Sequence, residues 1–265
     1  DIFAARATSS EGKIQVEMAQ LKYRSIRLAG FGTSMSRLGG GIGTRGPGEK
    51  KLEVDRRLIR NRISQLKEQV RNMESHRQVT RAKRQDNPVP VVAIVGYTNA
   101  GKSTLLNTLT AANVLEEDKL FATLDPTTRN YKLPNGQEVL LTDTVGFIRK
   151  LPHHLIDAFR STLEEAKYSD IIIHVVDCSN PSMDKNVHAV YETLKNLEVK
   201  DKIIITVFNK IDKVEEKPVL RDFNADYTVS AAIKKNIGLN EINDAIEAAL
   251  KSMRVMVEKV YDYSE

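Results

Sequence analysis

Residues 96–104, GYTNAGKST, constrain the fold of this chain more than any other stretch. They match the phosphate-binding loop pattern G-x-x-x-x-G-K-[ST]. The apolar run 91–95 predicts a strand before the loop, and the leucine-rich run STLLNTL predicts a helix after it. This order brings loop N–H groups and a helix N-terminus together, which is how proteins hold phosphate. A glycine turn that fits the pattern by chance is the alternative, and the two flanking elements argue against it.

Each residue type in this loop has a chemical reason to be there. Gly96 and Gly101 let the backbone curl closely around phosphates, because glycine has no Cβ atom. Lys102 is predicted to reach the β- and γ-phosphates, and the Ser103 hydroxyl is predicted to bind Mg²⁺. The predicted nucleotide-binding residues of the loop are Gly96, Tyr97, Thr98, Asn99, Ala100, Gly101, Lys102, Ser103 and Thr104.

Two later segments have the features of nucleotide-dependent switches. Residues 121–129, FATLDPTTR, offer three threonines as a possible second magnesium ligand: Thr123, Thr127 and Thr128. The run 138–142 predicts a strand that ends in Asp143-x-x-Gly146. A carboxylate at that strand end would lie near a magnesium-bound water, and the Gly146 amide could bond the γ-phosphate and sense its loss.

The motif Asn209-Lys210-Ile211-Asp212 indicates which base is bound, and it follows a predicted strand over 202–208. An aspartate accepts hydrogen bonds from guanine N1–H and the exocyclic amine, a pattern that adenine does not offer. An unpaired buried carboxylate would therefore reject adenine strongly. Residues 228–231 predict another strand, whose end places a backbone amide for guanine O6. A pure ATPase is a poor alternative.

The order of these motifs predicts an α/β fold, a P-loop GTPase domain with a mostly parallel sheet and helices on both faces. Residues 170–177 form a further apolar run of the kind buried in parallel sheets. His174 within that run and Cys178 after it are expected in the core. His153 and His154 are expected at the surface, and residues 240–253 are predicted to form the closing helix.

Charge divides the chain near residue 90. Residues 1–90 hold 19 Lys and Arg side chains against 9 Asp and Glu, whereas the rest of the chain holds 21 against 26. Two prolines at this boundary, in QDNPVPV, are expected to stop a helix and start a strand. The expected division is a basic region over 1–86, a nucleotide-binding domain over 87–253 and the start of a C-terminal segment over 254–265.

The basic region is predicted to form an antiparallel helical hairpin. A capping box from Thr8 to Glu11 marks the start of its first helix. Apolar residues then recur at spacings of four and three, which is typical of paired helices, and Met18 and Met73 are expected in the hairpin core. The two stripes are Ile14, Met18, Leu21, Ser25 and Leu28, and Ile59, Ile63, Leu66, Val70 and Met73.

The connection between the two helices, residues 30–49, is rich in glycine and has no helix or strand period. A loop of this length is uncommon in a compact domain and is often functional. Arginines and backbone amides suit phosphate-rich surfaces, and a solvated basic linker is an equal alternative. The predicted RNA-binding residues are Arg37, Gly39, Gly40, Gly41, Arg45, Lys50, Lys51, Arg56 and Arg57.

Four stretches together resemble the HflX-type GTPases, a branch of the Obg-HflX group of translational GTPases. They are residues 39–63, 96–110, 121–129 and 143–159, and the glycine-rich motif in the first is the most specific. The resemblance covers nearly the whole chain. It implies a factor that hydrolyses GTP, binds the large ribosomal subunit and its rRNA, and splits or rescues stalled or stressed ribosomes. It also implies further N- and C-terminal sequence.

The resemblance implies roles for individual residues. It favours Thr123 over Thr127 and Thr128 as the magnesium ligand beside Ser103. The implied catalytic residues are Lys102, Thr123, Asp143 and Gly146. The GTP-binding residues implied beyond the phosphate loop are Phe121, Ala122, Thr123, Leu124, Asp125, Asp143, Thr144, Val145, Gly146, Asn209, Lys210, Ile211, Asp212, Ser230, Ala231 and Ala232.

Phe147 stands where many GTPases have a glutamine that orients the attacking water. A phenylalanine side chain cannot hydrogen-bond water, and the HflX-type family is similar in using a hydrophobic residue here. We therefore expect slow hydrolysis of GTP to GDP and phosphate by the chain alone, and faster hydrolysis when a partner completes the site.

Composition suits a cytoplasmic protein, and we expect it to be a monomer when it is bound to the ribosome. Hydrophobic residues make up 41% of the chain and charged residues 28%, with a single cysteine. No apolar run reaches the length of a membrane span, so no stable membrane insertion is expected. Two alternatives remain open. One is a nucleotide-controlled assembly or stalling factor that binds rRNA without splitting ribosomes, and the other is a GTPase at acidic membranes.

Overall fold

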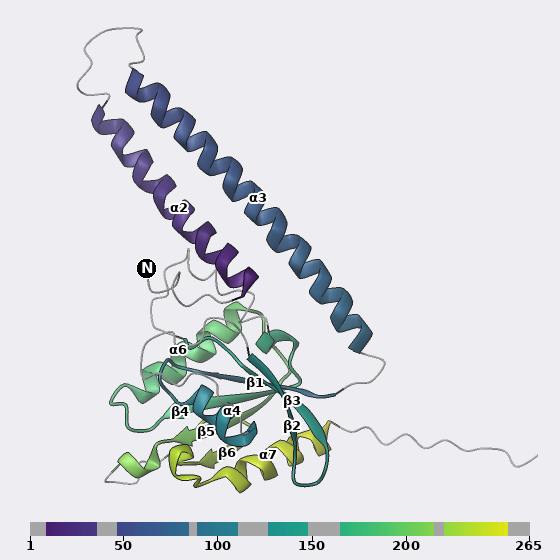
Figure 1. The fold of residues 1–265 in the computed structure, drawn as a ribbon. Helices are drawn as coiled ribbons and strands as arrows, with labels where there is room; N and C mark the ends of the chain where they lie inside the picture. The colour runs from purple at the N-terminus through teal and green to yellow at the C-terminus, as the bar shows by residue number, and fades with distance from the viewer. Residues whose placement is uncertain are drawn as a thin grey trace, which may run out of the picture.

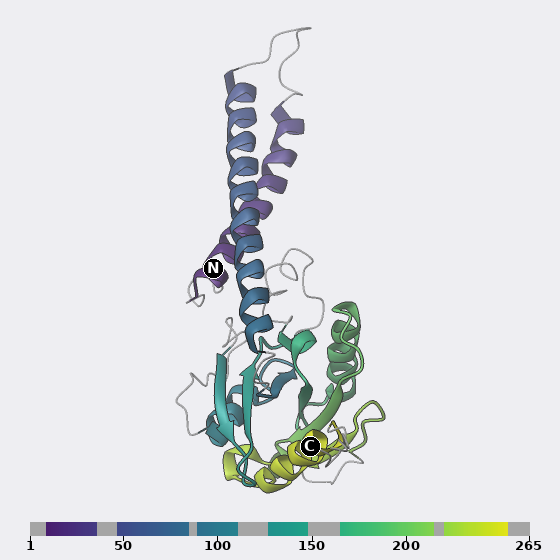
Figure 2. The ribbon, with the colours of Figure 1, turned by 90° about the vertical axis from the view of Figure 1, so that its right-hand side faces the viewer.

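The structure is a computed structural model that describes residues 9–35, 47–84, 89–110, 127–147, 165–214 and 220–253. It contains a long helical hairpin followed by a six-stranded sheet with helices on both faces (Figure 1). In two perpendicular views the hairpin extends away from the sheet (Figure 2). The elements are α2 (Ser10–Met35), α3 (Pro47–Arg84), β1 (Val91–Gly96), α4 (Lys102–Thr110), β2 (Thr127–Lys132), β3 (Glu138–Asp143), β4 (Ile171–Asp177), α6 (Met183–Asn196), β5 (Ile203–Asn209), η1 (Ile211–Lys213), β6 (Tyr227–Ser230), η2 (Ile233–Lys235) and α7 (Leu239–Ser252).

The helices α2 and α3 pack along the two predicted apolar stripes. Met18 and Leu66 are buried, and the other stripe residues, including Met73, are half-buried. At the surface of this seam the Arg62 guanidinium donates two hydrogen bonds to the Glu17 carboxylate, at 2.8 and 3.1 Å. The predicted antiparallel hairpin is therefore confirmed. No helix within the described parts of the chain is both long and apolar enough to cross a membrane.

The cap of α2 lies one residue later than predicted. The Ser9 hydroxyl oxygen accepts a hydrogen bond from the Gly12 amide at 2.8 Å, and the Ser9 carbonyl oxygen accepts one from the Lys13 amide at 3.1 Å. The Ser9 side chain therefore pairs one of the otherwise free first-turn amides, while its carbonyl accepts the first bond of the helix, as expected of a serine cap. Thr8, which was predicted to be the cap, lies outside the described residues.

The glycine-rich connection is shorter than predicted at both ends. Helix α2 continues through Gly30 and Gly32 to Met35, and α3 already begins at Pro47. A helical glycine costs only about 1 kcal/mol relative to alanine, and proline fits the first turn of a helix because its missing N–H is not needed there. The remaining predicted loop residues, among them Arg37, Gly39, Gly40, Gly41 and Arg45, lie outside the described residues.

The sheet has the strand order β2-β3-β1-β4-β5-β6, and every neighbouring pair except β2 and β3 is parallel. The predicted α/β fold with a mostly parallel sheet is confirmed. Strand β2 was not predicted, since its first residues were assigned to a switch segment. It is a polar edge strand with mostly exposed side chains, so no apolar period marks it in the sequence.

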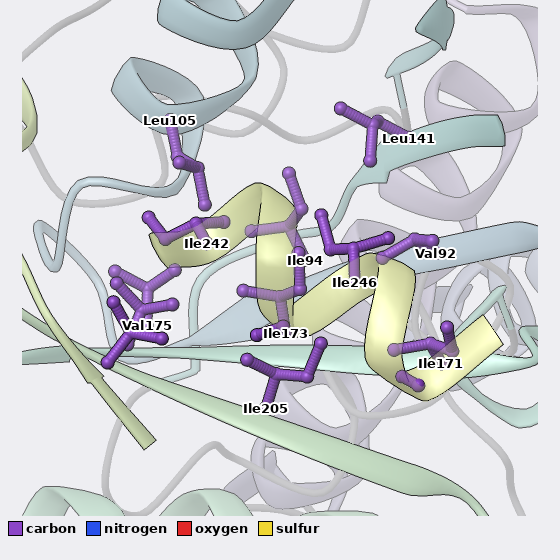
Figure 3. Packing of buried hydrophobic residues seen from close by; sticks show 14 of the residues in the cluster. Val92, Ile94, Leu105, Leu141, Ile171, Ile173, Val175, Ile205, Ile242 and Ile246 are labelled. Carbon is purple, nitrogen blue, oxygen red and sulfur yellow. The ribbon is translucent and has the colours of Figure 1, made fainter. Parts of the chain in front are cut away.

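Alternate residues of the central strands enter two apolar layers. Ile94 and Ile173 lie with Leu105 of α4 and Ile242 of α7 in one layer (Figure 3). The neighbouring residues in the chain, such as Val95, lie in the other layer with residues of α6 such as Val190 and Leu194. This alternation is the two-residue period of a strand that is covered on both faces. Helix α6 was not predicted, and α7 matches the predicted closing helix within one residue.

A buried polar cluster lies on the α6 face of the sheet. Asp222 Oδ2 accepts hydrogen bonds from the Tyr191 hydroxyl and the Thr206 hydroxyl, each at 2.7 Å. His174 Nδ1 lies 3.8 Å from the same oxygen, and its ring meets the Tyr191 ring edge-on at 5.3 Å. His174 is therefore a core residue, as predicted, and so is Cys178.

Burial and hydrogen bonding together set the protonation of this cluster. It lowers the pKa of His174, against the effect of the nearby Asp222, and so favours the neutral imidazole. Burial also opposes ionisation of Asp222, but the nearby His174 and the hydrogen bonds from Thr206 and Tyr191 hold the pKa of Asp222 well below its ordinary value. A neutral imidazole thus lies beside a buried carboxylate.

Acidification should destabilise the domain through His174. Because its folded pKa is below the unfolded value, the unfolded state takes up the proton first as pH falls. The stability is present above about pH 6.5 and is lost below it, by up to about 1.4 kcal/mol per pH unit. Urea unfolding between about pH 7 and about pH 5 measures this slope.

Two variants isolate the contribution of this histidine. His174→Asn should flatten the slope, whereas His188→Asn, at an exposed position of α6, should keep the slope of the parent chain. Equal slopes in all three proteins would contradict the assignment to His174.

Candidate guanine-nucleotide site

Two strands, β4 and β5, lie so close to the phosphate loop that only glycine fits at two of its positions. A Cβ atom on Gly96 would collide with the carbonyl oxygen of Val175 in β4. A Cβ atom on Gly101 would collide with the side-chain amide of Asn209 in β5, and the φ angle of Gly101 is 104°. The loop therefore passes closer to the sheet than any other residue type would allow.

The loop brings its lysine and its serine to β3. The Lys102 ammonium group is buried and donates to the Tyr97 carbonyl oxygen at 3.0 Å. Burial lowers the pKa of Lys102 to about 8, and the nearby Asp143 carboxylate opposes this shift. The Ser103 hydroxyl donates to Asp143 Oδ2 at 2.7 Å. Lys102, the predicted phosphate-binding cation, thus lies near both Ser103 and Asp143, which were predicted to lie at the magnesium ion.

The donor atoms of this place fit a magnesium ion. A hydroxyl and a carboxylate are hard oxygen donors, which Mg²⁺ prefers, and Asp143 is buried at the end of β3. Within the described ranges no group of three or more His, Cys, Asp and Glu side chains could hold another metal ion. Thr123, the expected second ligand, lies outside the described residues.

The two other threonines considered as magnesium ligands lie in β2. Thr127 pairs with Asp143 in the antiparallel ladder. The hydroxyl of Thr128 is 3.0 Å from that of Thr142, so it bonds across the two strands. The structure thus engages Thr128 within the sheet, which disfavours it as a metal ligand.

The segment from Asp143 to Phe147 lies directly on the phosphate loop. The Phe147 amide donates to the Gly96 carbonyl oxygen at 3.1 Å, and the Thr98 amide donates to the Phe147 carbonyl oxygen at 2.9 Å. A Cβ atom on Gly146 would approach Thr98 Cγ2 to 2.8 Å and Lys102 Nζ to 3.0 Å. Gly146 therefore lies against Thr98 and against Lys102, the residue that was predicted to reach the γ-phosphate.

The side chain of Phe147 points away from this site. It is 1% exposed and packs in the α6-side layer with Val95, Val145 and Leu194. The sequence placed Phe147 where other GTPases orient water. The structure shows that the residue at this position is a core anchor, so the side chain supplies no group to the site.

The guanine motif is bonded to the phosphate loop by two side chains. The Asn209 amide group donates to the Ala100 carbonyl oxygen at 2.9 Å, and its Oδ1 accepts from the Ile233 amide at 3.1 Å. The Lys210 ammonium group donates to the Asn99 carbonyl oxygen at 2.8 Å and to Asp177 Oδ2 at 2.7 Å. Loop and motif therefore form one hydrogen-bonded unit.

Asp212 is the side chain predicted to read the guanine edge. Its Oδ2 lies 3.0 Å from the ammonium group of Lys235 in η2, with 22% of the aspartate side chain exposed. The hydrogen bond from Lys235 lowers the pKa of Asp212, which keeps the carboxylate ionised. An ionised carboxylate is the acceptor that two guanine N–H groups need.

The backbone amides predicted to bond guanine O6 have partners in this structure. The Ala231 amide donates to the Phe208 carbonyl oxygen at 2.8 Å, and the Ala232 amide donates to the Ile237 carbonyl oxygen at 3.1 Å. A contact with O6 would have to share one of these bonds. The base contacts of Ser230, Ala231 and Ala232 therefore stay a prediction.

Two residues of the site were not found from the sequence. Asp177 holds Lys210, and it ends β4 as Asp143 ends β3; a carboxylate at the carboxyl end of a parallel strand was the available signal. Lys235, which pairs with Asp212, lies in a polar run without any period, so no signal marked it. The predicted GTP-binding residues 121–125, which belong to the first switch segment, lie outside the described parts of the chain.

The predicted RNA-binding residues at the start of α3 have different environments. Lys50 and Lys51 lie in the helix, as predicted, although the helix begins three residues earlier, at Pro47. Arg56 donates to the Leu28 carbonyl oxygen of α2 at 2.7 Å, so it holds the hairpin together. Arg57 is exposed.

Two family descriptions match the chain in sequence. Residues 6–84 match "GTP-binding GTPase Middle Region", and residues 91–210 match "50S ribosome-binding GTPase". A relative named "GTPase HflX" from Lacrimispora saccharolytica is 64% identical over the whole chain. The chain belongs to the HflX-type GTPases. Another HflX relative, from Caldanaerobacter subterraneus, is 56% identical over the same length, and the one from Escherichia coli is 47% identical over 82% of the chain.

The HflX relatives are longer than this chain, which spans 63% of the first, 61% of the second and 51% of the third. A solved structure of a GTP-binding protein from Sulfolobus solfataricus in complex with GDP is 26% identical, with a TM-score of 0.63. The likeness covers 96% of this chain and 70% of that one. The likeness to this one structure therefore includes both the hairpin and the sheet of the present chain.

Replacing Gly101 should disrupt the nucleotide site. Gly101→Ala places a Cβ atom against the Asn209 amide and strains the backbone, so we expect at least tenfold weaker guanine-nucleotide binding by calorimetry, on the order of 1.4 kcal/mol or more. Gly136→Ala is the matched control, because Gly136 also has a positive φ, 88°, but its Cβ atom would meet only the Lys132 side chain at 4.0 Å. Equal loss of binding in both variants would show that general destabilisation of the fold, and not the contact with Asn209, is responsible.

Proposed function

We propose that this chain binds and hydrolyses GTP and acts as a ribosome-associated factor, which binds the large subunit and splits or rescues stalled or stressed ribosomes. The observation that carries the nucleotide part is the bonding of Asn209 and Lys210 to the phosphate-loop carbonyls of Ala100 and Asn99. Through these bonds the carboxylate of Asp212, which we propose reads the base, would be held at a constant distance from the loop that we propose binds the phosphates.

Lys102 would bind the β- and γ-phosphates in place of the Tyr97 carbonyl oxygen. Ser103 and Thr123 would hold Mg²⁺, with Asp143 beside them. When bound, Mg²⁺ would neutralise the charge that develops on the phosphate oxygens. The segment through Gly146 lies against Thr98 and Lys102, so a γ-phosphate between them would have to displace it. That displacement is the means by which this segment would report the nucleotide state.

Hydrolysis by the chain alone would be slow. The Phe147 side chain is anchored in the core and orients no water. A partner that orders the two switch segments would complete the site. The assignment of that partner as the large ribosomal subunit is supported by the family description matched over residues 91–210 and by the basic hairpin. Cytoplasmic location and a monomeric bound state belong to the same proposal.

Asp212→Asn tests the base assignment. The variant faces the guanine amine with a donor, so guanine-nucleotide binding should weaken by on the order of 2–4 kcal/mol. Xanthine nucleotides, which carry an oxygen at that position, should bind relatively better. Titration calorimetry with GDP and xanthosine diphosphate measures both. Asp244→Asn, at an exposed position of α7, is the control; unchanged GDP affinity of Asp212→Asn would place the base elsewhere.

Large subunits should accelerate GTP hydrolysis by the chain substantially, and Lys102→Ala should abolish it with or without subunits. Phosphate release at increasing subunit concentration measures the effect. Fast hydrolysis that added subunits leave unchanged would contradict the partner-completed site. Sedimentation of ribosomes with GTP then distinguishes splitting from the alternative, a nucleotide-controlled assembly or stalling factor that leaves ribosomes intact.

A further inference from the structure

An open groove of about 870 Å³ lies between α2 and α3, outside the nucleotide site. The α2 residues that line it recur at spacings of three and four, so they share one face of the helix. The same holds for the α3 residues. The lining residues are Gln20, Tyr23, Arg24, Arg27, Leu28, Asp55, Leu58 and Ile59.

The groove exposes large apolar side chains that the hairpin does not use for its own packing. Tyr23 is 52% exposed and Leu58 is 58% exposed, whereas Met18 and Leu66 of the hairpin seam are buried. An aromatic ring and a leucine on opposite helices thus leave part of their surfaces to solvent. Covering such a surface with a flat apolar partner is favourable, because it removes apolar area from water.

Guanidinium groups surround this apolar floor. The Arg27 guanidinium lies 5.5 Å from the centre of the Tyr23 ring, in a cation–π arrangement. Arg24 lines the same wall one turn away. Asp55 provides a carboxylate acceptor in the same groove. These groups suit the parts of a nucleotide. The guanidinium groups can pair with phosphates, the ring and the apolar floor can cover the face of a base, and the carboxylate can accept from an amino group at the edge of a base.

We propose that this groove binds an unpaired nucleotide of single-stranded RNA. The base stacks on Tyr23 and Leu58, and the flanking phosphates pair with Arg24 and Arg27. The inference rests on the proposed function in that it takes RNA as the partner of the hairpin. It adds a second contact on the side of the hairpin, separate from the glycine-rich connection.

The chemistry of the groove favours this partner over other phosphate-bearing ones. A base in a duplex keeps its faces stacked, so it cannot cover the Tyr23 ring. A phosphatidylglycerol headgroup has no aromatic face to stack on Tyr23 and no N–H groups to donate to Asp55 as a base does. Residues 1–90, which contain the groove, hold 19 Lys and Arg against 9 Asp and Glu, so the region attracts a polyanion.

The absence of tryptophan from the sequence gives a direct probe. Tyr23→Trp places a single indole in the groove, where base stacking quenches its fluorescence. Tyr168→Trp is the matched control, because Tyr168 is 47% exposed and lies in the nucleotide-binding part of the chain. Each variant is titrated with an unstructured single-stranded RNA, a duplex RNA of the same length and phosphatidylglycerol vesicles.

Single-stranded RNA should quench Tyr23→Trp and leave Tyr168→Trp unchanged. In fluorescence anisotropy Tyr23→Ala should bind this RNA roughly tenfold more weakly than the parent chain, and Tyr23→Phe within about twofold, since the ring supplies the stacking. Equal quenching by duplex RNA or by vesicles would overturn the proposal. So would a signal that changes with protein concentration alone, which would show that a second copy of the chain covers the groove.

Co-sedimentation with large ribosomal subunits separates this inference from the proposed function. If the chain binds subunits but RNA does not quench Tyr23→Trp, the groove assignment fails and the ribosome proposal stands. If quenching is seen and subunits are not bound, the groove assignment stands and the ribosome proposal fails.

Discussion

The side-chain amide of Asn209 is the contact on which the nucleotide site depends. It donates to the Ala100 carbonyl oxygen and accepts from the Ile233 amide, so one buried group joins the phosphate loop, the end of β5 and the start of η2. Only glycine fits at position 101, because this amide occupies the space that a Cβ atom would need. The predicted phosphate-binding loop and the predicted base-reading motif are therefore not independent, because both are held by the same residue.

The sheet supports this contact from both faces. One face packs its large apolar cluster on α4 and α7. The α6 face also contains the buried cluster of His174, Tyr191, Thr206 and Asp222. Buried polar groups are tolerated when their hydrogen bonds are satisfied, and Asp222 accepts two of them. The cluster ties the segment before β6 to β5 and α6, which places β6 and the residues that follow it beside the base site.

Sequence patterns predicted those parts of the molecule in which chemistry fixes both residue type and spacing. The phosphate loop, the Asp143 strand end and the Asn209 motif were found because phosphate and guanine dictate them. The hairpin was found from its apolar period. Strand β2 was missed because an edge strand needs no apolar face. Lys235 was missed because its pairing with Asp212 depends on tertiary folding. The loop was predicted too long because Gly30 and Gly32, which were read as loop residues, do not end the helix.

Phe147 belongs to two environments at once. Its backbone is bonded to Gly96 and Thr98 of the phosphate loop, while its ring is packed with Val95 and Leu194 under α6. A close-packed layer does not deform continuously, so a shift of this backbone has to be matched by a rearrangement around the ring. The side chain that supplies no water-orienting group thus couples the backbone beside the phosphate loop to the side-chain packing under α6.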